Sequence, residues 1–240
     1  MPNPCKVKIC GTTSVTDAQM AANAGADYAG IVVEVPFSER SVSIAHAAEI
    51  AREATIPTVV LVFDQPTDWV RRAAEQIHPF AIQLLGHESP AEVGRLKRLV
   101  SCEIWKSLFL PTDGDQTVNI KTLLAEMAAH IDAGADALLF DTVDSSSGKT
   151  RYGGTGKTSD WNLAAQLIQT CSVPAFLSGG IRPENVKAAI ETVRPYGIDL
   201  CSGVESTKGV RDPRKLDLLM QQVRVASRKV LLENYIESLS

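Results

Sequence analysis

The chain has 240 residues, enough for one large domain or two small ones, and its 45% hydrophobic and 22% charged residues are typical of a globular protein. Its formal net charge of −4 excludes the basic surface that nucleic-acid binding needs. The sequence has neither an apolar run of about 18 residues nor a signal-peptide pattern, so we expect a cytoplasmic protein that does not bind membranes.

Short apolar runs alternate with segments of helical period along the chain. The runs, each typical of a buried strand, are Val7–Cys10, Tyr28–Val33, Thr58–Phe63, Ala81–Leu85, Ile104–Leu110, Ala137–Phe140, Ala175–Leu177 and Ile198–Cys201. The helical segments are Val15–Ala24, Ile44–Ala54, Trp69–Ile77, Ala91–Val100, Ile120–Ile131, Trp161–Ile168, Glu184–Val193 and Leu216–Val225. Eight strands that are each followed by a helix predict an α/β fold, a single-domain (βα)8 barrel over residues 1–240.

The connections between these elements repeat. Gly25 and Gly134 each end a helix two residues before the next strand, within Ala-Gly-Ala-Asp sequences. No linker or low-complexity segment interrupts the alternation, which favours one barrel over two domains. Residues from about 226 to 240 continue past the last expected helix, and we expect them to form a helical extension.

The carboxyl ends of the strands supply candidate site residues, because they face the active site in barrels of this class. They are Cys10-Gly11, Glu34, Asp64, Gln83, Lys106, Asp141, Ser178-Gly179-Gly180 and Ser202-Gly203. The last two groups follow the seventh and eighth strands, where barrels often bind a phosphate with backbone N–H groups. The alternative is that these glycines only form tight turns.

A loop rich in Ser, Gly and Lys follows Asp141 and precedes the helix that starts at Trp161. Gly154 and Gly156 in this loop would let backbone N–H groups approach an anion closely. A nucleotide P-loop requires a glycine five positions before Gly-Lys-Thr, and that position holds Arg151. We therefore expect a phosphate loop that does not bind ATP.

Nine segments together resemble the phosphoribosylanthranilate isomerase family of tryptophan biosynthesis. They are Val7–Thr13, Ser38–Arg40, Ile82–Leu84, Leu138–Thr142, Gly153–Thr158, Asp160-Trp161, Leu177–Ile181, Pro183–Val186 and Asp199–Glu205. They occur in the family's order and span the chain from Val7 to about Asp212.

The resemblance implies an Amadori rearrangement of N-(5-phosphoribosyl)anthranilate, with Cys10 as the base and Asp141 as the acid. The chemistry requires an acid for the ribose ring oxygen and a base for the C2′ proton. Cys10 would have to be a thiolate, favoured by cations such as Lys8 or Arg40, and Asp141 would have to keep its proton. From the residues alone, a buried structural cysteine and a helix-capping or salt-bridged aspartate stay open.

Further contacts to the substrate follow from the same resemblance. Arg40 would bind the anthranilate carboxylate through its guanidinium, with a surface arginine as the alternative. Gln83 would line the pocket, with a barrel-interior residue of no catalytic weight as the alternative. Gly154, Gly156, Ser178, Gly179, Gly180, Ser202 and Gly203 would bind the phosphorylated substrate.

The departures from the family pattern fall mainly at the aromatic end of the substrate. Leu85 stands where the family has a histidine, and His87 follows two positions later. Val33–Phe37 lacks the usual aromatic-rich run, and Trp105 is bulky for the middle of a strand. The same chemistry on a different phosphoribosyl amine, or a non-catalytic barrel that binds a phosphorylated ligand, therefore remains as an alternative.

Neither a cofactor nor a metal ion is expected. The four histidines lack ligand spacing, and the five cysteines form no Cys-x-x-Cys pair, so we expect free thiols. An isomerisation of this kind needs no redox cofactor. The expected partner is a small phosphorylated substrate, and the protein is expected to be a monomer or a homodimer.

Overall fold

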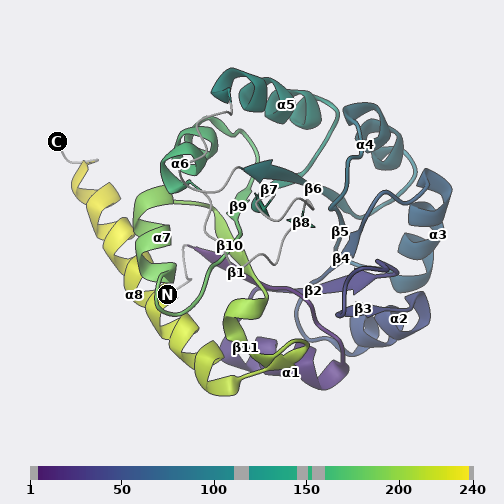
Figure 1. Cartoon of the computed structure of the whole chain (residues 1–240), viewed down its shortest axis with the longest axis horizontal. Coiled ribbons are helices and arrows are strands. Elements are labelled where there is room, and N and C mark those ends of the chain that lie inside the picture. Colours follow the sequence, from purple (N-terminus) through teal and green to yellow (C-terminus); the bar gives the residue numbers. More distant parts are fainter. Residues whose placement is uncertain (1–4, 111–118, 145–150, 153–159, 238–240) are drawn as a thin grey trace.

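Eight parallel strands form a closed ring with eight helices around it (Figure 1). The structure is a computed structural model and describes residues 5–110, 119–144, 151–152 and 160–237. The barrel strands are β1 (Lys6–Ile9), β2 (Tyr28–Val33), β4 (Thr58–Val62), β5 (Ala81–Leu84), β6 (Glu103–Leu110), β7 (Ala137–Asp144), β9 (Ala175–Leu177) and β10 (Gly197–Leu200). The helices are α1 (Val15–Ala24), α2 (Ile44–Glu53), α3 (Thr67–Ile77), α4 (Pro90–Lys97), α5 (Ile120–Asp132), α6 (Trp161–Thr170), α7 (Val186–Val193) and α8 (Pro213–Glu237). The single-domain (βα)8 barrel expected from the sequence is confirmed.

The ring closes because β1 pairs with both β2 and β10. Lys8 lies opposite Tyr28 on one side and opposite Asp199 on the other, and all pairings around the barrel are parallel. The carboxyl ends of all eight strands therefore open at the same end of the barrel. Residues far apart in sequence, such as Cys10 and Cys201, meet there.

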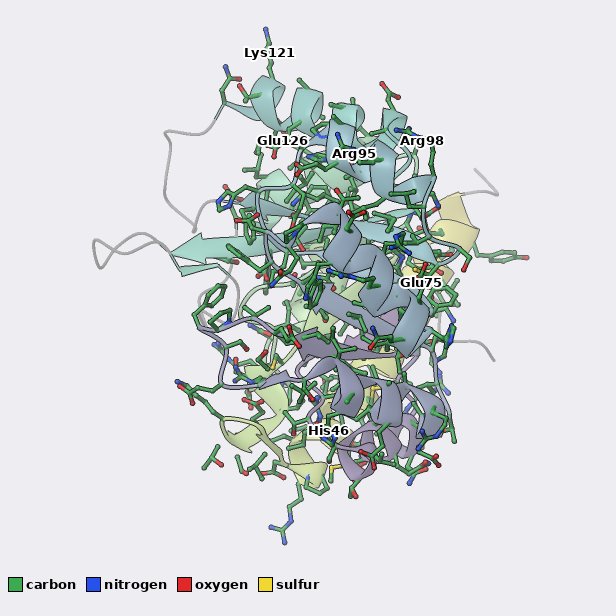
Figure 2. All side chains as sticks on the ribbon, turned by 90° about the vertical axis from the view of Figure 1, so that its right-hand side faces the viewer. His46, Glu75, Arg95, Arg98, Lys121 and Glu126 are labelled. Carbon is green, nitrogen blue, oxygen red and sulfur yellow. The ribbon has the colours of Figure 1, made fainter. Side chains whose placement is uncertain are left out.

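Strand residues alternate between two apolar regions. Outward-facing residues such as Val60, Ile82 and Phe140 pack under the helices in the largest hydrophobic cluster. Inward-facing residues at the amino ends of the strands, among them Trp105 and Phe176, form a second cluster inside the barrel. The Trp105 and Phe176 rings stack with their centroids 4.9 Å apart, so the bulky Trp105 helps to fill the barrel interior at the amino ends of the strands. The outer faces of the helices carry charged side chains such as Glu75, Arg95 and Lys121 (Figure 2).

Several helix boundaries follow from capping residues that the sequence displays. Ser14 and Ser43 accept backbone N–H groups at the starts of α1 and α2. Ser89 and Glu92 form a reciprocal capping box at the start of α4, and Gly25 ends α1 at φ 97°. Caps of this kind explain why the expected and observed ends agree closely.

The structure corrects the sequence expectation at β7. The expected strand ended at Phe140, but β7 runs to Asp144, so Asp141 lies within the strand. Asp141 and Thr142 continue the parallel ladder with Phe109 and Leu110 of β6. Asp141 hid this extension, because a carboxyl group that faces the pocket interrupts the apolar pattern of the strand.

Short additional elements surround the mouth of the barrel. They are β3 (Ser41–Val42), β8 (Arg151–Tyr152), β11 (Glu205–Thr207), β12 (Val210–Arg211) and the 3-10 turn Ser202–Val204. The last helix, α8, is continuous to Glu237, so it includes both the helix expected to end at Val225 and most of the segment expected as a helical extension. It extends beyond the ring in Figure 1. Over the described residues, no helix is long and apolar enough to cross a membrane.

Candidate active site

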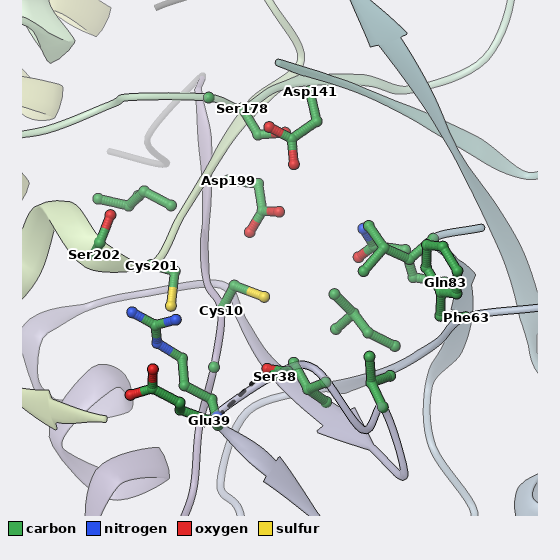
Figure 3. Close-up of a pocket in the computed structure, with 18 of the residues that line it drawn as sticks. Cys10, Ser38, Glu39, Phe63, Gln83, Asp141, Ser178, Asp199, Cys201 and Ser202 are labelled. Carbon is green, nitrogen blue, oxygen red and sulfur yellow. Dashed lines mark hydrogen bonds between the residues drawn. The ribbon is translucent and has the colours of Figure 1, made fainter. Parts of the chain in front are cut away.

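A pocket of about 620 Å³ lies at the open end of the barrel. Cys10, Asp141 and Asp199 line its centre, on or just after β1, β7 and β10. Figure 3 shows Asp199 between Asp141 and Cys10, with Ser202 and Phe63 on opposite sides of the pocket. The pocket therefore has a polar end, a reactive centre and an apolar end.

Cys10 follows β1, and its side chain is 9% exposed. Burial raises the pKa of its thiol, Lys8 and Arg211 oppose that shift, and Asp199 adds to it. Cations such as Lys8 were expected to make Cys10 a thiolate. Lys8 does act in that direction, but burial outweighs it and the net shift is upward.

Asp141 points from β7 into the pocket. Burial raises the pKa of its carboxyl group to about 7, against the backbone N–H of Thr142, which donates to it at 2.7 Å. The negative charge of Asp199 adds to the rise. Asp141 therefore keeps a proton near neutral pH, as an acid catalyst must. In the described part of the chain it forms no salt bridge and caps no helix.

A buried ion pair lies between these two residues. Lys8 Nζ is 2.9 Å from Asp199 Oδ1, with 0% and 8% of the two side chains exposed. Although burial disfavours the charge of Lys8, Asp199 and Cys10 together raise its pKa. Lys8 therefore keeps its positive charge at neutral pH, beside the Asp199 carboxylate.

Small residues form the polar end of the pocket. Ser178, Gly179, Gly180 and Ser202 line it. Gly179 has φ 86°, and a Cβ there would lie 2.9 Å from Thr142 Cβ, so the turn needs glycine. Gly203 does not line the pocket but packs on the backbone of Ile181, which leaves no space for a Cβ. Within the described segments, the amides of Gly179 and Gly180 donate to no protein acceptor.

Arg40 lines the pocket, but its guanidinium is already paired. Its Nε donates to Glu205 Oε1 at 2.7 Å and its Nη2 to Glu205 Oε2 at 2.5 Å. Glu205 raises the pKa of Arg40, and Arg40 holds the pKa of Glu205 below its usual range against the effect of burial. The bidentate geometry expected for a substrate carboxylate is therefore occupied by Glu205, and Nη1 is the guanidinium nitrogen that Glu205 does not bind.

Apolar side chains form the opposite end of the pocket, and they are Val32, Val35, Phe37, Leu61, Phe63 and Leu85. The Phe37 and Phe63 rings meet edge to face, with centroids 4.9 Å apart. Leu85 packs against Cys10 and its neighbours, whereas His87 bonds Asp64 at 2.8 Å outside the pocket. The aromatic surface therefore comes from one residue after β2, Phe37, and one after β4, Phe63, instead of from an aromatic-rich run after β2 alone.

Gln83 reaches the pocket from β5. Its Nε2 donates to Ser107 Oγ at 3.0 Å. Its Oε1 is buried and, among the described residues, without a hydrogen-bond partner. An unpartnered acceptor at the pocket wall suits a ligand that donates a hydrogen bond.

The structure does not bring every strand-end residue into the pocket. Glu34, Asp64 and Lys106 lie outside its lining. Lys106 faces away from the barrel interior and donates to Gly86 O at 2.7 Å and to Glu88 Oε2 at 3.2 Å. Its role is therefore structural. Gly154 and Gly156 lie outside the described residues.

Asp199 and Glu205 were not among the site residues expected from the sequence. Asp199 interrupts the apolar run of β10, and an acid at an inward-facing position of a barrel strand could have marked it. Glu205 gave no such signal, because its importance depends on Arg40, 165 residues earlier. Across the described residues, no group of His, Cys, Asp and Glu side chains is placed to hold a metal ion.

Comparisons of the sequence with known proteins agree on one family. A family model described as N-(5'phosphoribosyl)anthranilate (PRA) isomerase matches residues 7–222. The N-(5'-phosphoribosyl)anthranilate isomerase of Methanocella arvoryzae is 35% identical over 223 residues, which cover 92% of this chain and 98% of that protein.

Solved structures agree as well. A crystal structure of phosphoribosyl anthranilate isomerase from Thermotoga maritima matches with a TM-score of 0.77 and 28% identity, over 92% of this chain and 99% of that one. Another isomerase of this name, solved in complex with reduced 1-(o-carboxyphenylamino)-1-deoxyribulose 5-phosphate, matches with a TM-score of 0.74 and 25% identity, over 92% and 99%. The barrel, its pocket and these matches over nearly the whole chain show that it belongs to the N-(5'-phosphoribosyl)anthranilate isomerase family.

Proposed function

We propose that this protein catalyses the Amadori rearrangement of N-(5-phosphoribosyl)anthranilate to the carboxyphenylamino-deoxyribulose phosphate, in tryptophan biosynthesis. The observation that carries the proposal is the pocket centre, where a carboxyl group with a pKa of about 7 and a thiol line the same pocket. The family membership and the ligand in the related complex support the choice of substrate.

Asp141 acts first, as the general acid. It protonates the ring oxygen of the ribose while the nitrogen lone pair forms a C1′–N double bond and the C1′–O bond breaks. The Cys10 thiolate then removes the C2′ proton. The electrons of that C–H bond form a C1′–C2′ double bond, and the nitrogen recovers its lone pair. The resulting enolamine becomes the ketone when C1′ gains a proton and the C2′ hydroxyl loses one.

The reactive form of the site carries a proton on Asp141 and none on Cys10. Because the pKa of Asp141 is about 7 and that of Cys10 is raised above its ordinary value, this form is a minor one. A thiolate of high pKa is a strong base, which compensates for its low population. Lys8 and Arg211 favour this thiolate.

The remaining contacts follow from the two ends of the pocket. The amides of Gly179 and Gly180, with Ser178, Ser202 and the turn at Gly203, form the phosphate site that we propose. The anthranilate ring occupies the apolar end beside Phe63, with its carboxylate at the free edge of Arg40. Gln83 Oε1 accepts a hydrogen bond from the substrate.

The apolar end argues for anthranilate rather than a polar amine. A substrate with a charged or strongly polar amine would leave polar groups unpaired against Leu61, Phe63 and Leu85. We also place the enzyme in the cytoplasm as part of this proposal. Its five cysteines are all free, as is usual in a reducing compartment.

Genetic complementation tests the proposed function. A bacterial strain that lacks its own isomerase is transformed with the wild-type gene or with Cys10→Ala and plated without tryptophan. We expect growth with the wild type only. Failure of the wild type to support growth, with folded protein present in the cells, would contradict the proposal.

A further inference from the structure

We propose that the buried Lys8–Asp199 ion pair is a positioning element of the reaction. The pair faces both Cys10 and Asp141 and sets the electrostatic environment of these two side chains. The proposal deepens the function proposed above and rests on it. Lys8 and Asp199 touch each other across the β1–β10 ladder, where they are register partners. Neither Lys8 nor Asp199 is the acid or the base.

The position of Lys8 on β1 directs it toward the thiol. Lys8 and Cys10 are two residues apart, so their side chains leave the same side of the chain. Gly30 on the neighbouring β2 leaves the space that both use. A Cβ at Gly30 would lie 3.0 Å from Lys8 Nζ and 3.1 Å from Cys10 Sγ. The ammonium and the thiol therefore border one small volume.

Through Asp199, the ion pair also faces Asp141, the proposed acid. Asp199 lines the pocket with Cys10 and Asp141, and Figure 3 shows its carboxylate between them. Among the described residues, Lys8 is the one cation that its side chain contacts. Its negative charge raises the pKa of Asp141, while Lys8 lowers it. The same two charges act on Cys10 in the same senses.

Other charged groups near the thiol have different partners. Arg211 on β12 donates to Cys10 O at 2.8 Å and is paired with Asp17 at 2.5 Å. Arg40 after β2 is paired with Glu205. For Asp141, the backbone N–H of Thr142 is the further polar contact. Of the charged side chains that act on both groups, the described residues show Lys8 and Asp199.

Removal of the positive charge and removal of the negative charge of the pair should shift the pH dependence of the site in opposite directions. Lys8→Met leaves Asp199 unopposed, so Cys10 and Asp141 both hold their protons to higher pH. Asp199→Asn leaves Lys8 unopposed, so both lose their protons at lower pH. We expect each limb of the pH profile of kcat/KM to move by about one unit, which is about tenfold in rate at a fixed pH on a limb.

Alkylation of Cys10 provides a readout that needs no turnover. The protein is treated with iodoacetamide across a pH series, and the Cys10 peptide is quantified by mass spectrometry. We expect Lys8→Met to slow alkylation about tenfold at neutral pH and Asp199→Asn to accelerate it by a similar factor. Alkylation that changes in the same direction in both variants, or in neither, would overturn the proposal.

Control variants separate this role from a purely structural one. Lys6→Met removes a similar lysine–aspartate pair on the same strand. Lys6 Nζ is 2.8 Å from Asp27 Oδ1, and neither residue lines the pocket. We expect it to leave the alkylation and the pH limbs unchanged. Lys8→Met/Asp199→Asn removes both charges and leaves no unpaired buried ion, and it should fall between the single variants. This double variant also keeps the test valid where a single variant does not fold.

The two readouts distinguish failure of this proposal from failure of the proposed function. Opposite alkylation shifts in a protein that does not convert N-(5-phosphoribosyl)anthranilate would contradict the function and, with it, a role for the pair in that reaction. Turnover by the wild type, with pH limbs that move in neither single variant, would overturn the role of the pair alone.

Discussion

Cys10 and Asp141 are the residues on which the proposed reaction depends. We expect Cys10→Ala and Asp141→Asn to lower kcat by at least about a thousandfold, because each removes a group that acts only in the transition state. Affinity for a ribose phosphate should stay within about tenfold, since neither residue lies at the polar end of the pocket. Steady-state kinetics and ligand titration measure the two effects. A parallel loss of binding and turnover would instead indicate a structural role.

The pH dependence of kcat/KM follows from the two pKa values. Below about 7, both groups are protonated, and the reactive form declines as the pH falls because Cys10 must lose a proton. Above the raised pKa of Cys10, both groups are deprotonated, and the reactive form declines because Asp141 lacks its proton. We therefore expect a plateau between the two values. A rate that already declines as the pH rises through about 7 would contradict this order.

At this scale, the sequence could predict the proposed acid and base but not their surroundings. Cys10 and Asp141 stand at positions that the family pattern marks. Asp199 is separated from Lys8 by 191 residues, so their contact depends on closure of the barrel. The net rise in the pKa of Cys10 also depends on burial, which no local pattern reveals.

Among the elements, the turns after β9 and β10 together support the proposed phosphate site. Gly203 packs on the backbone of Ile181 and Arg182, and an added Cβ would have no space. We expect Gly203→Ala to push the two turns apart and to weaken ribose 5-phosphate binding at least about tenfold, or about 1.4 kcal/mol. Gly209→Ala is the control, because nothing lies within 4 Å of its added Cβ. Isothermal titration measures both variants, and equal losses would contradict the packing argument.

Most elements could be predicted because their outward faces must pack under a helix. The strand Ala175–Leu177 and the helix Val15–Ala24 agree with the expected bounds at both ends. The extension of β7 to Asp144 could not be predicted, since the apolar run stops at Asp141, whose carboxyl group faces the pocket. The short strand β3 was missed for a related reason, because two residues form no recognisable pattern.

For the whole molecule, ligand binding should raise stability without a change of fold. Ribose 5-phosphate at about a hundred times its Kd should add about 2.7 kcal/mol to the free energy of unfolding. For a chain of this length, that corresponds to a rise in Tm of about 5–10 °C. Differential scanning fluorimetry measures it, with ribose as the control that lacks the phosphate. A similar rise with ribose would show that the phosphate is not what the site recognises.

The most direct test of the account is the conversion of freshly prepared N-(5-phosphoribosyl)anthranilate by the purified protein. Loss of the substrate's fluorescence follows the reaction, and mass spectrometry with chromatography identifies the product. We predict turnover to the carboxyphenylamino-deoxyribulose phosphate that disappears in Cys10→Ala. No conversion by the folded wild-type protein, or conversion that Cys10→Ala retains, would contradict the account.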